Sequence, residues 1–161
     1  MPIAYWITEK MINNFSKGIS IEQISDFTGS QNITADNDKF LRFFWEINQS
    51  DVLSMNWVFY AKGGSYRKWY GNIDLVVDWR ESARYFYQTN PTSNLLNERY
   101  WYKEGITYTE LTNLGNSFRL LPEGMVFDKK GPSIVNVEHL YYCLALLNSN
   151  LANEYFQILN L

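Results

Sequence analysis

The chain has 161 residues, of which 46% are hydrophobic and 17% aromatic, and its formal net charge is −3. This length suits one domain with its own core, and the acidic balance argues against a nonspecific nucleic-acid binder, which is usually strongly basic. Its only cysteine, Cys143, excludes an internal disulfide and favours a reducing compartment. Because there is neither a bilayer-spanning apolar run nor a secretory signal pattern, we expect a soluble, cytoplasmic protein.

The first third of the chain predicts a helix, a polar loop and a strand. Residues 4–16 carry apolar side chains every three or four positions, which predicts an amphipathic helix. A polar stretch follows, with turn-forming residues at 28–30 and 36–38. The aromatic stretch 40–47, "FLRFFWEI", then predicts a buried strand.

The middle of the chain predicts strands joined by tight turns. Two strand-like stretches, 57–62 and 65–71, flank Gly63 and Gly64, which predicts a hairpin with its turn at the glycines. Residues 72–79 predict a further strand.

The rest of the chain mixes helices with short strands. Residues 80–88 predict a short helix, and strand-like segments broken by glycine and proline follow between 100 and 137. From residue 140 an apolar stripe at helical spacing, interrupted at 148–150, predicts two helices, with Ser149 or Asn150 as N-cap of the second.

We therefore expect a single domain over 1–161 of the α+β class. Its strand-rich mixed sheet would be flanked by an N-terminal helix and a C-terminal helical hairpin. Since the apolar stripe is still running at Leu161, we expect a fragment of a larger protein.

No catalytic or metal-binding constellation is visible. One histidine and one cysteine cannot supply the three or four ligands of a zinc site. We expect His139 to be a capping or surface residue and Cys143 to be a small buried one. Nucleophile-elbow, P-loop and dinucleotide motifs are missing, and the Asn-Pro pair at 90–91 is typical of a turn.

The stretch "KGGSYRKWYGN", 62–72, combines three cations, three rings and three glycines. If 65–70 is extended, Tyr66, Lys68 and Tyr70 share one face and Arg67 the other, with Trp69. Such cations can neutralise phosphates, and glycines allow a ligand backbone to approach closely. The alternative is a hairpin with its rings in the core and its cations in solvent. Weaker candidates stand at other strand ends and loops: Arg42, Lys103, Arg119, Lys129 and Lys130.

In this order, the segments "DNDKF", "KGGSYRKWYGN", "VVDW", "EGITY" and "SFRLLPEGMVFDKKGPSI" make the chain resemble a known family. The resemblance is to the region behind the catalytic domain in BREX/Pgl-type phage-exclusion adenine-specific DNA methyltransferases, which are similar to type IIG-like restriction–modification enzymes. It covers nearly the whole chain.

The resemblance implies a noncatalytic target-recognition region for double-stranded DNA. In that family an upstream domain binds S-adenosylmethionine and methylates adenine N6, and it would be this region's partner within the same parent chain. We expect no cofactor here; whether the parent also cleaves DNA is left open. The resemblance favours DNA-binding roles for Lys62, Gly63, Gly64, Arg67, Lys68 and Tyr70. Arg42, Arg119, Lys129 and Lys130 are further DNA-binding candidates because they stand at strand ends and loops, where a groove reader needs its cations.

A motif shared across a family that reads different sequences is better suited to positioning the DNA backbone, or to structure, than to reading bases. Base readers are therefore expected in less family-like segments, such as 80–99 or 30–34. The alternative is a protein-interaction module that docks onto the methyltransferase domain or other defence-system subunits. The aromatic surplus, the acidic balance and the helical hairpin favour this alternative.

Overall fold

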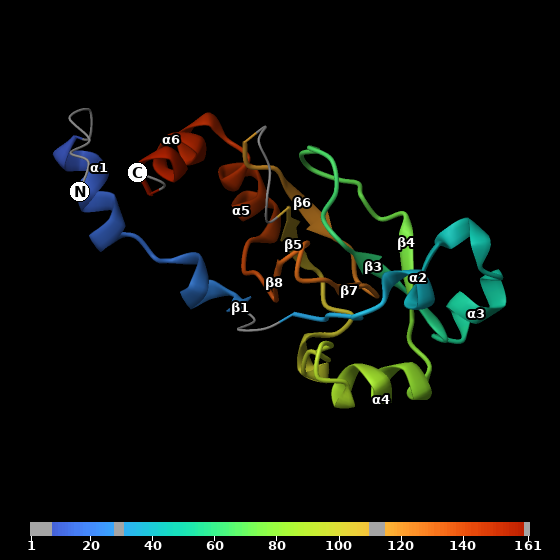
Figure 1. Cartoon of the computed structure of the whole chain (residues 1–161). Coiled ribbons are helices and arrows are strands. Elements are labelled where there is room, and N and C mark those ends of the chain that lie inside the picture. Colours follow the sequence, from blue (N-terminus) through green and yellow to red (C-terminus); the bar gives the residue numbers. More distant parts are fainter. Residues whose placement is uncertain (1–7, 28–30, 110–114, 160–161) are drawn as a thin grey trace.

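The computed structural model describes residues 8–27, 31–109 and 115–159. Within them, two four-stranded sheets lie between outer helices (Figure 1), which confirms the predicted α+β class. The first sheet is antiparallel, in the order β1 (Asp26–Phe27), β8 (Ser133–Val135), β5 (Gly105–Tyr108) and β6 (Phe118–Leu121). The second has the order β2 (Leu41–Phe43), β4 (Leu75–Asp78), β3 (Trp57–Ala61) and β7 (Val126–Phe127).

The second sheet is mixed, because β3 pairs antiparallel with β4 but parallel with β7. The helices and 3₁₀ turns that surround the sheets are α1 (Glu9–Lys17), η1 (Ile21–Ile24), α2 (Asn37–Phe40), η2 (Phe44–Glu46), α3 (Gln49–Leu53), α4 (Glu81–Thr89), η3 (Glu98–Tyr100), α5 (Leu140–Leu147) and α6 (Asn150–Leu159).

The predicted helices are found. Helix α4 matches the stretch 80–88, and α5 and α6 form the C-terminal pair, with Ser149 Oγ accepting a hydrogen bond from the Ala152 N–H at 3.2 Å as the cap of α6. Helix α1 covers the later part of the N-terminal prediction. The earlier part, 4–7, and the predicted turn formers at 28–30 lie outside the described residues.

The core has three buried clusters that follow the layers of Figure 1. One joins the second sheet to α4 through Ala83 and Tyr87, and another joins the first sheet to α5 through Cys143 and Leu144. The third draws on both sheets, with Leu121 of β6 near Phe127 of β7. The two sheets are therefore held by one shared apolar layer.

The strand predicted at 40–47 is too long. Of this stretch only β2, residues 41–43, is a strand, and it pairs with β4. The chain then turns into η2, where the Phe43 N–H donates to the Glu46 carboxylate at 2.7 Å. Phe43, Phe44 and Trp45 are 45%, 44% and 62% exposed rather than buried. A local capping interaction at the sheet edge thus outweighs the β propensity of this aromatic run.

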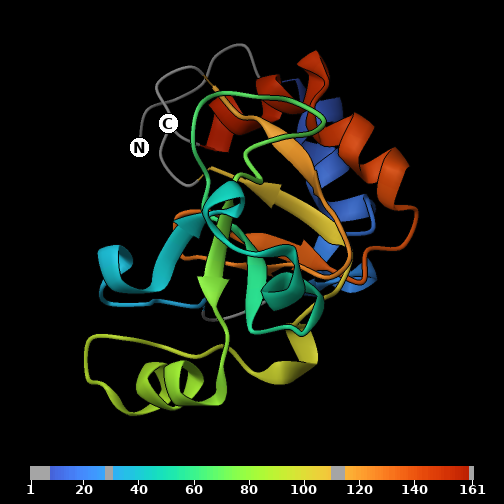
Figure 2. The same ribbon diagram turned by 90° about the vertical axis from the view of Figure 1, so that its right-hand side faces the viewer.

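The hairpin predicted around Gly63 and Gly64 is wrong. The neighbours of β3 are β4 and β7. Residues 62–72 form an irregular connection, which we call the glycine-rich loop, and it passes the β6 edge of the first sheet (Figure 2). Positive φ angles at 63, 64, 69, 71 and 72 prevent an extended strand there. The alternating faces expected for 65–70 therefore do not exist.

Candidate nucleic-acid interface

The ends of two parallel strands bring together residues that are distant in sequence. β3 and β7 pair with Ala61 opposite Phe127, and the Asp128 N–H donates to the Ala61 carbonyl at 2.8 Å. Because both strands end at the same edge, Lys62 lies beside residues 128–130. This edge gathers three of the predicted cations: Lys62, Lys129 and Lys130.

The buried carboxylate of Asp128 organises this edge. It accepts hydrogen bonds from the Tyr60 hydroxyl and the Lys130 N–H, each at 2.8 Å, and its Oδ2 lies 3.5 Å from Lys62 Nζ. Burial, aided by the Asp128 charge, raises the pKa of Tyr60 well above its ordinary value, so this hydroxyl stays a neutral donor. Burial lowers the pKa of Lys62, and the Asp128 carboxylate partly offsets this. The negative charge of Asp128 is thus compensated by Lys62 and by the hydrogen bonds from Tyr60 and the Lys130 N–H.

Glycines allow the two strand ends to touch. A Cβ on Gly63, whose φ is +79°, would lie 2.5 Å from the Lys130 carbonyl oxygen. A Cβ on Gly131 would lie 2.6 Å from Gly63 N and 2.7 Å from the Ala61 carbonyl oxygen. Gly63 is also buried, so its first role is structural: it lets the chain pass close enough to set Lys62 against Asp128.

Three hollows share Lys62 in their linings. The first, about 170 Å³ in volume, lies between residues 33–37 and 128–130, and we call it the basic hollow. Its charged lining is Lys62, Lys129, Lys130 and Asp128, three cations against one carboxylate. Lys129 and Lys130 are exposed, so the basic hollow offers them to an anion.

The other two hollows carry balanced charge. One, of about 410 Å³, sets Arg42 and Lys62 against Asp38 and Glu46. The other, of about 360 Å³, contains Gly63 and Gly64 and sets Lys62 against Asp74. Among the three hollows that share Lys62, the excess positive charge therefore lies in the basic hollow.

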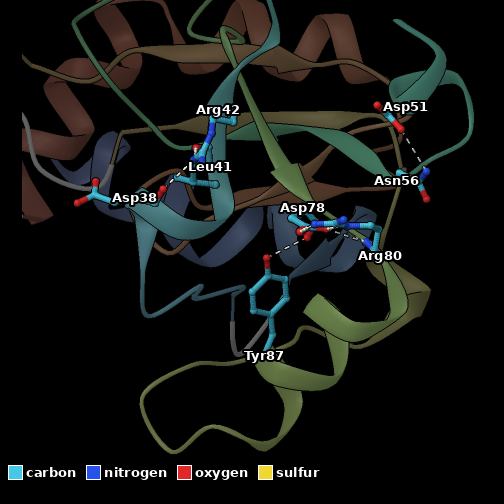
Figure 3. Close-up of polar contacts among 8 residues, drawn as sticks. All are labelled: Asp38, Leu41, Arg42, Asp51, Asn56, Asp78, Arg80 and Tyr87. Carbon is cyan, nitrogen blue, oxygen red and sulfur yellow. Dashed lines mark hydrogen bonds and ion pairs between the residues drawn. The ribbon is translucent and has the colours of Figure 1, made fainter. Parts of the chain in front are cut away.

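The half-buried Arg42 is partly committed to its own segment (Figure 3). Its Nη1 donates to the Asp38 carbonyl at 2.7 Å and to the Leu41 carbonyl at 2.6 Å, which ties the end of α2 to the start of β2. Arg42 lines the neighbouring hollow, but this internal bonding limits its reach.

The glycine-rich loop sends its other predicted residues elsewhere. The Trp69 N–H donates to the Phe118 carbonyl and the Trp69 carbonyl accepts from the Leu120 N–H, both at 2.9 Å, so the loop adds to the edge of β6. Lys68 Nζ donates to the Asn148 carbonyl at 2.8 Å, at the end of α5. Lys68 therefore has a structural bond that stabilises the junction of loop and helix.

Arg67 and Tyr70 are exposed on the same loop, Tyr70 by 56%. Neither lines any of the three hollows that share Lys62. The loop motif is thus divided. Lys62, Gly63 and Gly64, together with Ser65 and Asn72, line the hollows, whereas Arg67, Lys68 and Tyr70 face other surroundings.

Arg119 cannot serve as a direct surface contact, because it is only 1% exposed. One face of β6 packs against α5, and its outer edge is paired with the glycine-rich loop at Trp69. Its guanidinium donates to Thr109 Oγ1 at 3.1 Å and Ser117 Oγ at 3.2 Å, and burial lowers its pKa. The prediction of a DNA-contacting Arg119 is corrected. Its Nη1 also donates to the Arg67 carbonyl at 3.4 Å, so Arg119 fastens the β5–β6 end to the loop.

The expectations for His139 and Cys143 agree with the structure. His139 is exposed at the start of α5, while Cys143 is buried and its thiol pKa is raised by that burial. Across 8–27, 31–109 and 115–159, no three His, Cys, Asp or Glu side chains come close enough to hold a metal ion. Among these same residues no helix is long and apolar enough to cross a membrane.

Sequence reasoning missed Asp128 and Tyr60, which hold the edge together. Nothing local marks them, since Tyr60 reads as an ordinary strand residue and Asp128 as a turn former. Their importance follows from the parallel pairing of β3 with β7, two strands separated by more than sixty residues in the chain.

Comparison with known proteins gives no matching family model. Two curated proteins are similar over nearly the whole chain. Adenine-specific methyltransferase PglX of Lacticaseibacillus casei (strain Zhang) is 29% identical over 180 residues, 99% of this chain and 15% of that protein. Adenine-specific methyltransferase BrxX of Escherichia coli O9:H4 (strain HS) is 34% identical over 165 residues, 94% of this chain and 13% of that protein.

The chain therefore has homologues among adenine-specific methyltransferases of the BREX/Pgl type, as its motifs indicated, and it spans about one seventh of their length.

Proposed function

We propose that this chain is a noncatalytic module that binds double-stranded DNA and directs an adenine-specific methyltransferase to its target. The observation that carries the proposal is the basic hollow, formed by long-range packing in a chain similar to part of two such enzymes. Exposed lysines in a hollow suit the phosphates of a DNA backbone, which position a protein without reading sequence.

The parent protein would transfer a methyl group from S-adenosylmethionine to adenine. The residues described here do not fit that cofactor: the connections from β4 to α4 and from β8 to α5 contain no glycine, and Gly63-Gly64 lead into a loop rather than a helix. We therefore place the cofactor and the methyl transfer in the catalytic domain, outside this segment, and assign this chain to the DNA.

Replacing Lys129 and Lys130 together by alanine should weaken binding to all duplexes about equally. Each lysine that neutralises a phosphate releases a counterion, so the slope of log K against log salt should fall by about two. Anisotropy titrations of a labelled duplex at several salt concentrations measure this slope.

The matched control replaces Lys10 and Lys17 of α1, which lies at the other end of the molecule (Figure 1). This change removes the same number of positive charges. If both double variants change the slope equally, net charge rather than the basic hollow governs binding, and the proposal fails.

A protein-interaction module is the second candidate, and an exposed aromatic patch favours it. Trp45 stacks on Phe43 with ring centres 4.6 Å apart, and Phe44 meets Trp45 edge to face at 5.1 Å. Leu53 and Met55 nearby in sequence are 76% and 43% exposed. Contiguous exposed apolar groups often mark protein contacts, and the catalytic domain of the parent is the partner we propose.

If this patch docks the catalytic domain, Trp45→Ala should weaken their association by about tenfold, as truncation of a buried aromatic anchor does. Calorimetry of the two purified parts, treated with nuclease, would measure it. Unchanged affinity for the catalytic domain, with folding intact, would remove the patch from the interface.

A further inference from the structure

The outward face of α4 carries side chains suited to the edges of nucleobases. Glu81, Arg84, Tyr85 and Gln88 stand at positions i, i+3, i+4 and i+7, so they share one face of the helix. Glu81 and Gln88 are exposed, Tyr85 is 67% exposed and Arg84 is half-buried. Ala83 and Tyr87 face the core instead.

The helix is held firmly against the second sheet. The Tyr87 hydroxyl donates to the Asp78 carbonyl at 2.9 Å, and Arg80 Nε donates to Asp78 Oδ1 at 2.9 Å (Figure 3). Phe40 and Trp79 pack on the Tyr87 ring, with centroid distances of 5.0 and 6.3 Å. A rigid helix presents its side chains in fixed positions, as selective recognition requires.

A cavity of about 630 Å³ lies beside this face, where Leu95 and Trp101 approach α4. Trp101 is fixed by a 2.8 Å hydrogen bond from its Nε1 to the Leu96 carbonyl and by an edge-to-face contact with Trp79. The Arg84 guanidinium lies over the Trp101 ring, 5.7 Å from its centre. Its planar fork is thus oriented by an aromatic surface.

The other polar side chains of this face have no bonding partner among the described residues. Within the described parts of the chain, no hydrogen bond or ion pair engages the side chains of Glu81, Tyr85 or Gln88, and Glu81 makes no ion pair with Arg84. An ordinary solvated helix face is rich in paired lysines and glutamates. Arginine and glutamine instead match guanine and adenine edges respectively, each through two hydrogen bonds.

The face is also connected to the basic hollow. Ile33 pairs with Asn94, in the loop that follows α4, through two 2.9 Å backbone hydrogen bonds. Ile33 and Thr34 also line the basic hollow. This pairing thus joins the lining of the basic hollow to the loop that follows α4.

We propose that α4 enters the major groove of the duplex, with Arg84 and Gln88 as the residues that determine sequence specificity. This inference rests on the proposed DNA-binding function. It narrows the base-reading segment predicted from the sequence, 80–99, to one helix face.

Selection from a randomised duplex pool tests the inference. The selected sequence should be bound about tenfold or more weakly by Gln88→Ala and by Arg84→Lys, since each loses a bidentate contact. Affinity for unrelated duplexes should stay within about twofold, because phosphate contacts remain. Repeating the selection with each variant should show relaxed preference at one base position.

Gln157→Ala, an exposed glutamine of α6, is the matched control and should alter neither affinity nor preference. Circular dichroism verifies the fold, and Gln88→Glu, which keeps size but changes the donor pattern, replaces any variant that unfolds. If folded variants still bind DNA and keep the same base preferences, the role of α4 in recognition is overturned, but the proposed DNA-binding function is not. If the wild-type chain binds no duplex, the proposed function itself fails.

Discussion

Replacing Gly63 by alanine should lower the free energy of unfolding by about 3 kcal/mol. The left-handed φ of +79° costs a residue with a Cβ about 1–2 kcal/mol. The new Cβ would also lie 2.5 Å from the Lys130 carbonyl oxygen, a backbone atom that cannot rotate away, and such overpacking adds about 1–3 kcal/mol. Denaturant unfolding followed by tryptophan fluorescence measures the loss.

Gly124→Ala separates the two causes. Gly124 has a similar φ of +86°. Apart from its two chain neighbours, however, no atom of the described residues lies within 4 Å of the position that an alanine methyl would take, so Gly124→Ala should lose only about 1 kcal/mol. Equal losses for both variants would mean that the close contact between the two strand ends contributes nothing. The double glycine would then be better explained by approach of a ligand.

Replacing Asp128 by alanine should also cost about 3 kcal/mol or more. The change leaves Lys62 half-buried without its ion-pair partner, and removing one member of such a pair costs about 3–5 kcal/mol in buried settings. The Tyr60 hydroxyl, on a fully buried side chain, loses a charged acceptor. Thermal or denaturant unfolding of the two proteins measures the difference.

Asp74→Ala is the control for this prediction, because Asp74 is exposed and borders the neighbouring hollow. Its loss should change stability by less than about 0.5 kcal/mol. If Asp128→Ala is equally mild, the carboxylate does not organise the strand ends, and the geometry of the basic hollow must have another origin.

Local pattern was sufficient for the parts of the fold that depend on neighbours in sequence. Helix α4 follows from its own periodicity, and the break between α5 and α6 follows from the Ser149 cap. β4 likewise lies inside the predicted strand 72–79. Its residues are buried on both faces, and such a strand reads as a continuous apolar run in the sequence. In these segments propensity, burial and capping agree.

The errors come from contacts between distant segments. Gly63 and Gly64 favoured a hairpin turn, but the position of Gly63 is dictated by Lys130, which the parallel pairing of β3 with β7 brings alongside. Arg119 was predicted to be a surface cation, yet the glycine-rich loop pairs with the edge of its strand at Trp69. No local signal reveals either contact.

The candidate site was therefore only partly predictable. The presence of functional cations in 62–72 and at 129–130 was an expectation from composition and resemblance. The structure groups Lys62, Lys129 and Lys130, and separates them from Arg67, Lys68 and Tyr70. Motif membership alone could not have divided these residues, since adjacent positions of one loop face different surroundings.

Hydrogen exchange of the chain with and without duplex DNA is the most direct measurement of where DNA lies. Binding through the basic hollow predicts slowed exchange in 33–37 and 128–131, together with α4, while α1 and α6 remain unchanged. Binding that protects only α1, α5 or α6, or a duplex that protects nothing at low salt, would contradict the account.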